Sequence, residues 1–376
     1  MIRVSLSKPA TLWDDQFALR PGWHDVDMMS KDSSGKLHHY VPRGYLRGFA
    51  TEKERITVLP LDSGRQSYTP SVKNVAAQTH FYRVEELEEP GAFETALSSI
   101  EGEGLAIIRR VMQGEFPLPE VDRWKLSYYS ALQHVRGPDT RRTIEHLQAS
   151  MVRLEIGAGG RPHAKSWIKR NLGFEATDQE ANRLWDQATQ PGGPPIRFSN
   201  LKHIQHLLDT AEQITPYLAA RPWSLIRFKT RSLITSDAPV SLVRNLSDDA
   251  WQGVGFATAW GITFPLTRKI GLLMSDPMVM VEQYDIDDPR LQEMRAAILR
   301  GDADRIQAGT AAMEKLFNEH TAEHAREYLF HHPDDGSYVP KNLHEPTLIN
   351  AKVGGIADAD FDGQPWFGMK SPERHE

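Results

Sequence analysis

Apolar residues recur at helical intervals through the first half of the chain. Over residues 91–113 they include Leu97, Ile100 and Ile108, which share one face of a helix with 3.6 residues per turn. Pro117 ends this pattern, and a second one runs over residues 120–136. Further helices are predicted over residues 139–156, 164–172, 178–187, 200–217, 288–300 and 302–330.

Short apolar or alternating runs predict strands on both sides of this helical region. Residues 55–61 and 66–69 have a hairpin pattern around the turn sequence Asp62-Ser63-Gly64-Arg65. Later strands are predicted over residues 223–228, 232–235, 258–265 and 270–275. The combined pattern predicts an α+β fold with a helical centre flanked by small, mainly antiparallel sheets.

Breaks in the pattern divide the chain into three parts. Residues 1–35 predict an irregular leader, and residues 331–376, rich in His, Pro, Gly and Asp, predict an irregular tail. Residues 36–330 between them are expected to form a single unit. A lobe boundary is expected near residues 190–196, where the sequence Pro191-Gly192-Gly193-Pro194-Pro195 is the strongest break in the chain.

The composition is typical of a folded protein and narrows the classes of function. The chain has 376 residues, of which 40% are hydrophobic and 25% are charged, with a net charge of −6. This balance argues against a strongly basic surface that coats nucleic acid or an acidic membrane, although it leaves room for a local basic groove. With 0 cysteines, disulfides, thiolate metal sites and a cysteine nucleophile are excluded.

The amino-terminal segment contains no apolar core of signal-peptide length. Lys8 and Pro9 interrupt it, and no later apolar run approaches the length of a bilayer span. A cytoplasmic location without a membrane partner is therefore expected.

Several sequence stretches resemble one protein family. They are His38–Ala50 (HHYVPRGYLRGFA), Asn74–Ala76 with Phe81–Tyr82, Tyr129–Arg136 with Pro138 and Arg141, Leu233–Val240, and, more weakly, Phe264–Thr267 with Asn318 and Ala325. Together they resemble the mostly bacterial family known as domain of unknown function 4238, over about residues 37–330. The family often has Asn where this chain has Ala238. The resemblance implies one fold unit and a candidate site, but no reaction.

Two histidines and one aspartate are the first candidates for chemistry. His38 and His39 are adjacent, so on a strand they point to opposite faces and rarely bind one metal together. One of them is a candidate general base or metal ligand, and the alternative is a polar start to an element whose apolar residues form core. Asp237 follows an apolar strand and could bind a cation or orient a histidine; alternatively, it caps a turn before Pro239.

A glutamate and a group of arginines are the next candidates. Glu101 lies beside glycines inside a helical pattern, which indicates close approach of a backbone or ligand, or else a solvated helix face. Arg136, Arg141 and Arg142 bracket the Gly137-Pro138 break and could bind a phosphate or carboxylate. The alternative for Arg136 is to cap the preceding helix.

The sequence His320-Thr321-Ala322-Glu323-His324 matches the H-x-x-E-H pattern of inverted zinc peptidases. His320 and His324 fall on one helical face and could bind a metal, with Glu323 as base. Against a peptidase, the tail offers few candidates for a distant third ligand, namely Asp334, Asp335 and Glu345. A pattern with three fixed positions also arises by chance in a chain with 15 histidines.

These residues lead to one hypothesis and two alternatives. The hypothesis is a hydrolase-like pocket for a phosphorylated or nucleic-acid substrate, in which a divalent metal would be the cofactor. Its catalytic residues would be His38 or His39, Glu101 and Asp237, and its binding residues would be Arg136, Arg141 and Asn318. The alternatives are a non-catalytic sensor or binding module for an anionic ligand, and a structural interaction protein whose histidines are enclosed.

Overall fold

The computed structural model describes residues 37–85, 87–245, 253–281, 284, 288–349, 351 and 361–365. The leader expected over residues 1–35 lies outside the described residues, as does most of the tail beyond residue 351. The chain separates into two compact units. We call the described residues of 37–138 and 200–348 the main unit, and those of 139–199 with 361–365 the inserted unit.

A five-stranded sheet forms the centre of the main unit. Its strand order is β6 (Ser241–Val243), β7 (Gly261–Thr267), β8 (Ile270–Ser275), β4 (Trp223–Arg227) and β9 (Arg305–Ala308). All neighbouring pairs are antiparallel except β4 and β9. Every residue of β7 is buried, because both faces of the sheet are covered by helices.

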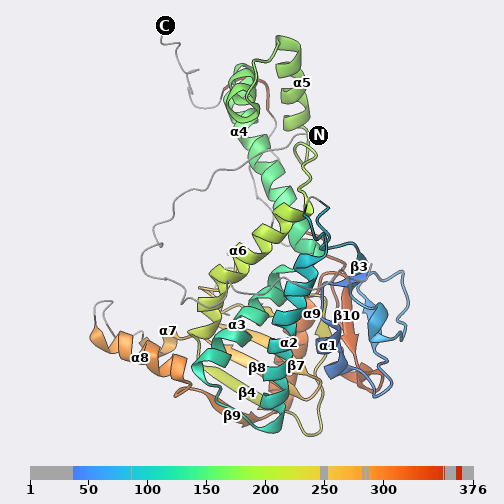
Figure 1. Ribbon diagram of the computed structural model, residues 1–376, viewed down its shortest axis with the longest axis vertical. Coiled ribbons are helices and arrows are strands. Elements are labelled where there is room, and N and C mark those ends of the chain that lie inside the picture. Colours follow the sequence, from blue (N-terminus) through green and yellow to red (C-terminus); the bar gives the residue numbers. More distant parts are fainter. Residues whose placement is uncertain are drawn as a thin grey trace. The chain divides into compact units, whose positions relative to one another are not determined.

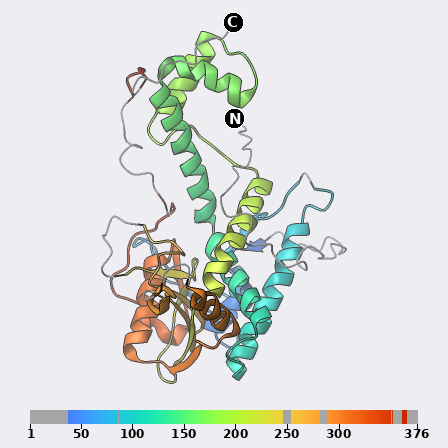
Figure 2. The ribbon, with the colours of Figure 1, turned by 90° about the vertical axis from the view of Figure 1, so that its left-hand side faces the viewer.

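Helices α3 (Glu120–Val135) and α9 (Ala311–His324) cover opposite faces of this sheet. Phe264 of β7 lies 6.4 Å from the ring of Tyr129 on α3, whereas a Cβ at Gly271 would meet Phe317 on α9. Phe264 pairs with Leu272, the neighbour of Gly271, so the two contacts lie on opposite faces. Helices α2 (Ala92–Gln113) and α6 (Asn200–Ala219) pack against α3, and the three form one layer (Figures 1 and 2).

Two smaller sheets complete the main unit. β1 (Leu37–His39) pairs with β3 (Ala77–Thr79), and β10 (Tyr328–His331) lies between β2 (Thr57–Pro60) and β5 (Thr235–Ser236). All these pairs are antiparallel, which confirms the predicted α+β class with small, mainly antiparallel sheets. The remaining elements of this unit are α1 (Arg43–Leu46), η1 (Arg47–Phe49), η2 (Val72–Asn74), α7 (Met278–Val281), α8 (Pro289–Arg300) and η3 (Pro333–Tyr338).

The prediction of one long helix over residues 302–330 is wrong. The segment divides into β9, α9 and β10, with Thr310 capping α9 by accepting a hydrogen bond from the amide of Met313. β9 and β10 find strand partners in β4 and β2, which are distant in sequence. Tertiary pairing therefore overrides the local helical pattern.

The inserted unit contains α4 (Pro138–Leu172) and α5 (Asp178–Thr189). α4 joins the two helices predicted over 139–156 and 164–172, and its backbone leaves the helical conformation at Gly160, where φ is 71°. α5 begins with a capping box between Thr177 and Glu180. Trp167 and Trp185 belong to the hydrophobic core of this unit.

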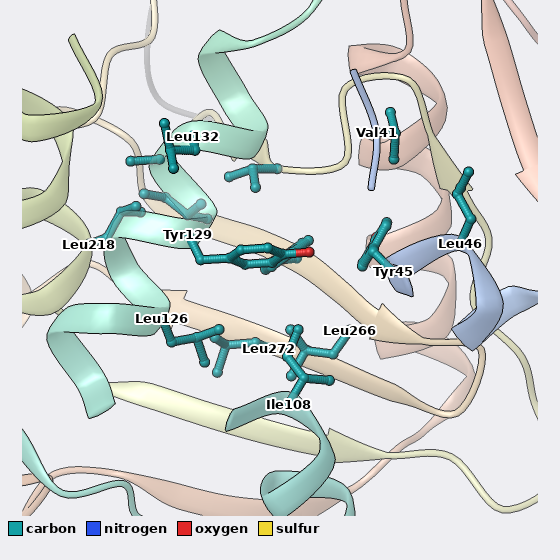
Figure 3. Close-up of a cluster of buried hydrophobic side chains, with 14 of the residues drawn as sticks. Val41, Tyr45, Leu46, Ile108, Leu126, Tyr129, Leu132, Leu218, Leu266 and Leu272 are labelled. Carbon is teal, nitrogen blue, oxygen red and sulfur yellow. The ribbon is translucent and has the colours of Figure 1, made fainter. Parts of the chain in front are cut away.

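The apolar residues of the His38–Ala50 motif belong to the core of the main unit. Tyr45 and Leu46 are fully buried, and the Tyr45 hydroxyl donates to the carbonyl oxygen of Pro265 at 2.6 Å. Figure 3 shows Tyr129 among leucines of α3 and the strands, with its hydroxyl directed toward Tyr45. The charged residues of the motif, Arg43 and Arg47, both pair with Glu54, and its two histidines make separate polar contacts.

Candidate functional site

The β1–β3 ribbon directs the two adjacent histidines into different environments. His38 is 2% exposed, and its Nδ1 accepts a hydrogen bond from the Tyr82 amide at 2.9 Å. Because Nδ1 is the acceptor, His38 is neutral with its proton on Nε2. His39 is half-buried, and its Nε2 lies 3.2 Å from the carbonyl oxygen of Lys73, to which it donates. The Nδ1 of a neutral His39 is therefore left as a proton acceptor.

Two carboxylates on α2 lie next to these histidines. Glu94 and Glu101 are seven residues apart, so they lie about two turns apart on one helix face. Glu94 Oε2 lies 4.0 Å from His38 Nδ1, and Glu101 acts electrostatically on both Glu94 and His39. Burial lowers the pKa of His39, and the Glu101 charge partly offsets that effect.

Glu94 has an unusual environment for a carboxyl group. Its Oε2 is buried and has no hydrogen-bond partner within the described part of the chain, although its side chain as a whole is 25% exposed. Burial, followed by repulsion from Glu101, raises the pKa of Glu94 to about 7, against an opposing effect of Arg136. Glu94 therefore exchanges its proton near neutral pH.

Arg136 at the end of α3 connects these residues. Its Nη1 lies 2.7 Å from Glu101 Oε1, its Nη2 donates to the His39 carbonyl oxygen at 2.7 Å, and its Nε donates to the Tyr82 hydroxyl at 3.2 Å. Burial lowers the pKa of Arg136, but the interactions with Tyr82 and Glu101 outweigh this effect and hold its pKa above the ordinary value. Since all three guanidinium nitrogens are engaged within the protein, Arg136 positions its neighbours rather than offering a free anion site.

We call this group the α2 carboxylate site; it consists of His38, His39, Tyr82, Glu94, Glu101 and Arg136. The structure thus brings together four of the residues selected from sequence: the two histidines, Glu101 and Arg136. Sequence reasoning missed Glu94 and gave no role to Tyr82. The signal for Glu94 was its position two turns before Glu101 on the same predicted helix.

Asp237 is bonded at a different place in the main unit. Its carboxylate accepts hydrogen bonds from the backbone amides of Arg326, Glu327 and Tyr328 at 2.8, 2.7 and 3.1 Å. These contacts fix the start of β10. Asp237 therefore bonds backbone amides, as the alternative of a turn cap expected. These amides belong to residues 326–328, however, and not to the local turn before Pro239.

Asn318 makes its contacts on α9, and Arg141 belongs to the other unit. Asn318 is 1% exposed; it accepts from the Ile234 amide at 3.0 Å and donates to Glu314 at 2.7 Å. Its amide therefore holds α9 against the chain near β5. Arg141 is half-buried in α4 and belongs to the inserted unit.

The H-x-x-E-H residues form a separate group on α9. One ligand atom from each of His320, Glu323 and His324 lies within 4.8 Å of the others, and the described residues contain no other such group of three. Burial, followed by the nearby Arg326 charge, lowers the pKa of His324 to about 4. Asp335, one of the expected distant ligands, is engaged by Arg268 at 2.8 and 2.9 Å.

The fold and this polar group define an α+β protein with paired carboxylates at the end of a histidine-bearing ribbon. A model of the family described as protein of unknown function (DUF4238) matches residues 37–335, so the chain belongs to that family. No curated protein and no solved structure matches it. In the described part of the chain, no helix has both the length and the apolar character of a membrane span.

Proposed function

We propose that the α2 carboxylate site is the acid–base centre of a hydrolase-like enzyme, in which Glu94 donates a proton and Glu101 is held in place by Arg136. The observation that carries this proposal is the buried, unpartnered Oε2 of Glu94 on a side chain that is still 25% exposed. A carboxyl group left without internal partners, but within reach of solvent, is available to a substrate.

The two carboxylates have different surroundings, which supports different roles. Glu101 forms an ion pair with buried Arg136 at 2.7 Å. Glu94 has no such partner in the described residues and keeps its proton to near neutral pH. A carboxyl group whose pKa is raised by burial serves as the proton donor in many hydrolases. His39, through Nδ1, is the second candidate base.

The substrate class that we propose is a phosphorylated compound or a nucleic acid. Two exposed basic residues adjoin the site and support an anionic substrate. Lys73 supplies the carbonyl oxygen that bonds His39, and the ring of His80 lies 6.4 Å from that of His38. A cytoplasmic location, expected from the sequence, suits such substrates and is part of the proposal.

The test compares E94Q with E103Q on the same helix. Glu103 is exposed and pairs with Lys125 at 2.7 Å, so E103Q makes the same chemical change away from the site. Wild type and both variants are assayed on phosphomonoesters, nucleotides, RNA and single-stranded DNA. We expect E94Q to lower turnover at least about 100-fold and E103Q to leave it unchanged.

A second expectation concerns the pH dependence of this activity. If Glu94 is the acid, turnover falls as the pH rises above about 7, because the proton is lost. Full activity of E94Q, or an equal loss in E103Q, would contradict the assignment.

The alternative is a non-catalytic sensor that binds an anionic ligand at the same place. It is favoured by the exposed basic residues Lys73 and His80 beside the site. In that case nucleotides or phosphate would raise the melting temperature without being turned over. The structural alternative would show neither binding nor turnover.

A further inference from the structure

The carboxyl-terminal half of α9 presents two histidines and a glutamate that the proposed reaction does not use. We propose that His320, Glu323 and His324 bind a divalent transition-metal ion such as Zn²⁺. This inference is independent of the α2 carboxylate site.

The donor set and its spacing fit such an ion. One donor atom from each residue lies within 4.8 Å of the other two, so modest side-chain rotation would bring all three to the distance of about 2 Å at which Zn²⁺ binds nitrogen and oxygen. Two imidazoles and one carboxylate are ligands that Zn²⁺ prefers, whereas Ca²⁺ and Mg²⁺ prefer oxygen alone. The positions i, i+3 and i+4 share one face of α9, so the helix itself fixes their relative placement.

The three side chains are accessible from outside the protein. His320 is 21% exposed and Glu323 is 63% exposed, and His324 is intermediate. An ion could therefore enter without unfolding of α9.

Existing hydrogen bonds hold the two histidines in place. His320 Nδ1 lies 2.8 Å from Glu323 Oε2, and His324 Nδ1 donates to the His320 carbonyl oxygen at 3.0 Å. His324 Nε2 accepts from the Leu242 amide at 3.3 Å, which is the longer of its two bonds. Coordination of a metal through Nε2 would replace this long hydrogen bond. The bond from Nδ1 to the His320 carbonyl oxygen would remain, and such backbone bonds commonly orient metal-binding histidines.

The arrangement differs from that of an inverted zinc peptidase. Glu323 is bonded to His320 rather than standing free as a base. Asp335 is held by Arg268, and neither Asp334 nor Glu345 joins the group among the described residues. We therefore infer a site with three protein ligands from one helix, whose remaining positions are open to water or to an external ligand.

The experiment measures Zn²⁺ binding to the metal-stripped, full-length protein by calorimetry, and repeats it with Co²⁺ for its absorption spectrum. The variants are H320A and E323Q, and the control is H206A, a half-buried histidine on α6. His320 is chosen over His324 because His324 bonds the backbone of β6 and its loss would affect folding. Far-UV circular dichroism verifies that each variant is folded.

We expect wild type and H206A to bind about one Zn²⁺ per chain, and H320A and E323Q each to bind it at least about tenfold more weakly. The Co²⁺ complexes of wild type and H206A should show the absorption of a site with nitrogen and oxygen ligands, and those of H320A and E323Q should lose it. Wild-type affinity in both H320A and E323Q, or no Zn²⁺ binding by wild type, would overturn the proposal. An equal loss in H206A would overturn it as well, because it would indicate non-specific binding.

Discussion

At the scale of single residues, the environment of Glu94 has a cost for the folded state. Its folded pKa of about 7 lies above the ordinary value of 4.5, so the folded protein keeps a proton that the unfolded chain releases. Between these two pH values, rising pH therefore lowers the free energy of unfolding. Functional sites often keep such an unfavourable group because the chemistry needs it.

The first prediction at this scale is that E94Q removes that pH dependence. Relative to wild type, E94Q should gain stability from about pH 4.5 to about pH 7, at about 1.4 kcal/mol per pH unit and by roughly 3 kcal/mol in total. Above pH 7 the difference should level off. Urea unfolding at several pH values measures it, with E103Q as control. Parallel curves for wild type and E94Q would contradict the assigned environment.

The second residue-scale prediction concerns Asp237, which receives three backbone hydrogen bonds at the start of β10. D237A should lower the free energy of unfolding by about 3 kcal/mol or more, because it leaves amides at a 7%-exposed position without their charged acceptor. D237N keeps one acceptor oxygen and should lose less. Denaturant unfolding distinguishes the two variants. A folded D237A of wild-type stability that lacks activity would instead support the catalytic hypothesis for Asp237.

At the scale of secondary-structure elements, the contact between α2 and α3 depends on a glycine. A Cβ at Gly104 would lie 2.5 Å from ring carbons of Tyr129, whereas a Cβ at Gly102 would meet nothing within 4 Å. The close approach expected from the glycines beside Glu101 is thus made at Gly104, by a side chain of α3. This contact sets the distance between the helix that bears the carboxylates and the helix that bears Arg136.

The two glycines give a matched pair of predictions. G102A should stabilise the protein by up to about 1 kcal/mol, because alanine is the better helix former and space is available. G104A should destabilise it by about 1–3 kcal/mol despite the same gain, because Tyr129 must move. Thermal unfolding of both variants measures the difference. Equal stabilisation by the two changes would show that the helices can separate freely.

At the scale of the whole molecule, local patterns predicted some parts well and others poorly. The helix predicted over 91–113 is observed as Ala92–Gln113, because its apolar face and its following prolines are local signals. The segment 302–330 was mispredicted because its strands exist only through partners such as β4 and β2. Short strands with distant partners leave little trace in a local window.

The candidate site was predictable to a similar extent. The motif stretches contained His38, His39 and Arg136, and the structure brings them together with Glu101. The special character of Glu94 could not be predicted, since it depends on burial and on a second carboxylate two turns away. The partners of Asp237 were hidden for a related reason, because they lie about ninety residues further along the chain.

The four residues His80–Arg83 lie beside both points at which the chain of the main unit is interrupted by the insertion. Arg136 donates to the Tyr82 hydroxyl and lies just before the insertion begins. Asn200 is the first residue after the insertion, and it donates to the carbonyl oxygen of Arg83 at 2.7 Å. Tyr82 also supplies the amide that holds His38. The single turn His80–Arg83 is therefore bonded to both ends of the chain segment that carries the insertion, as well as to His38.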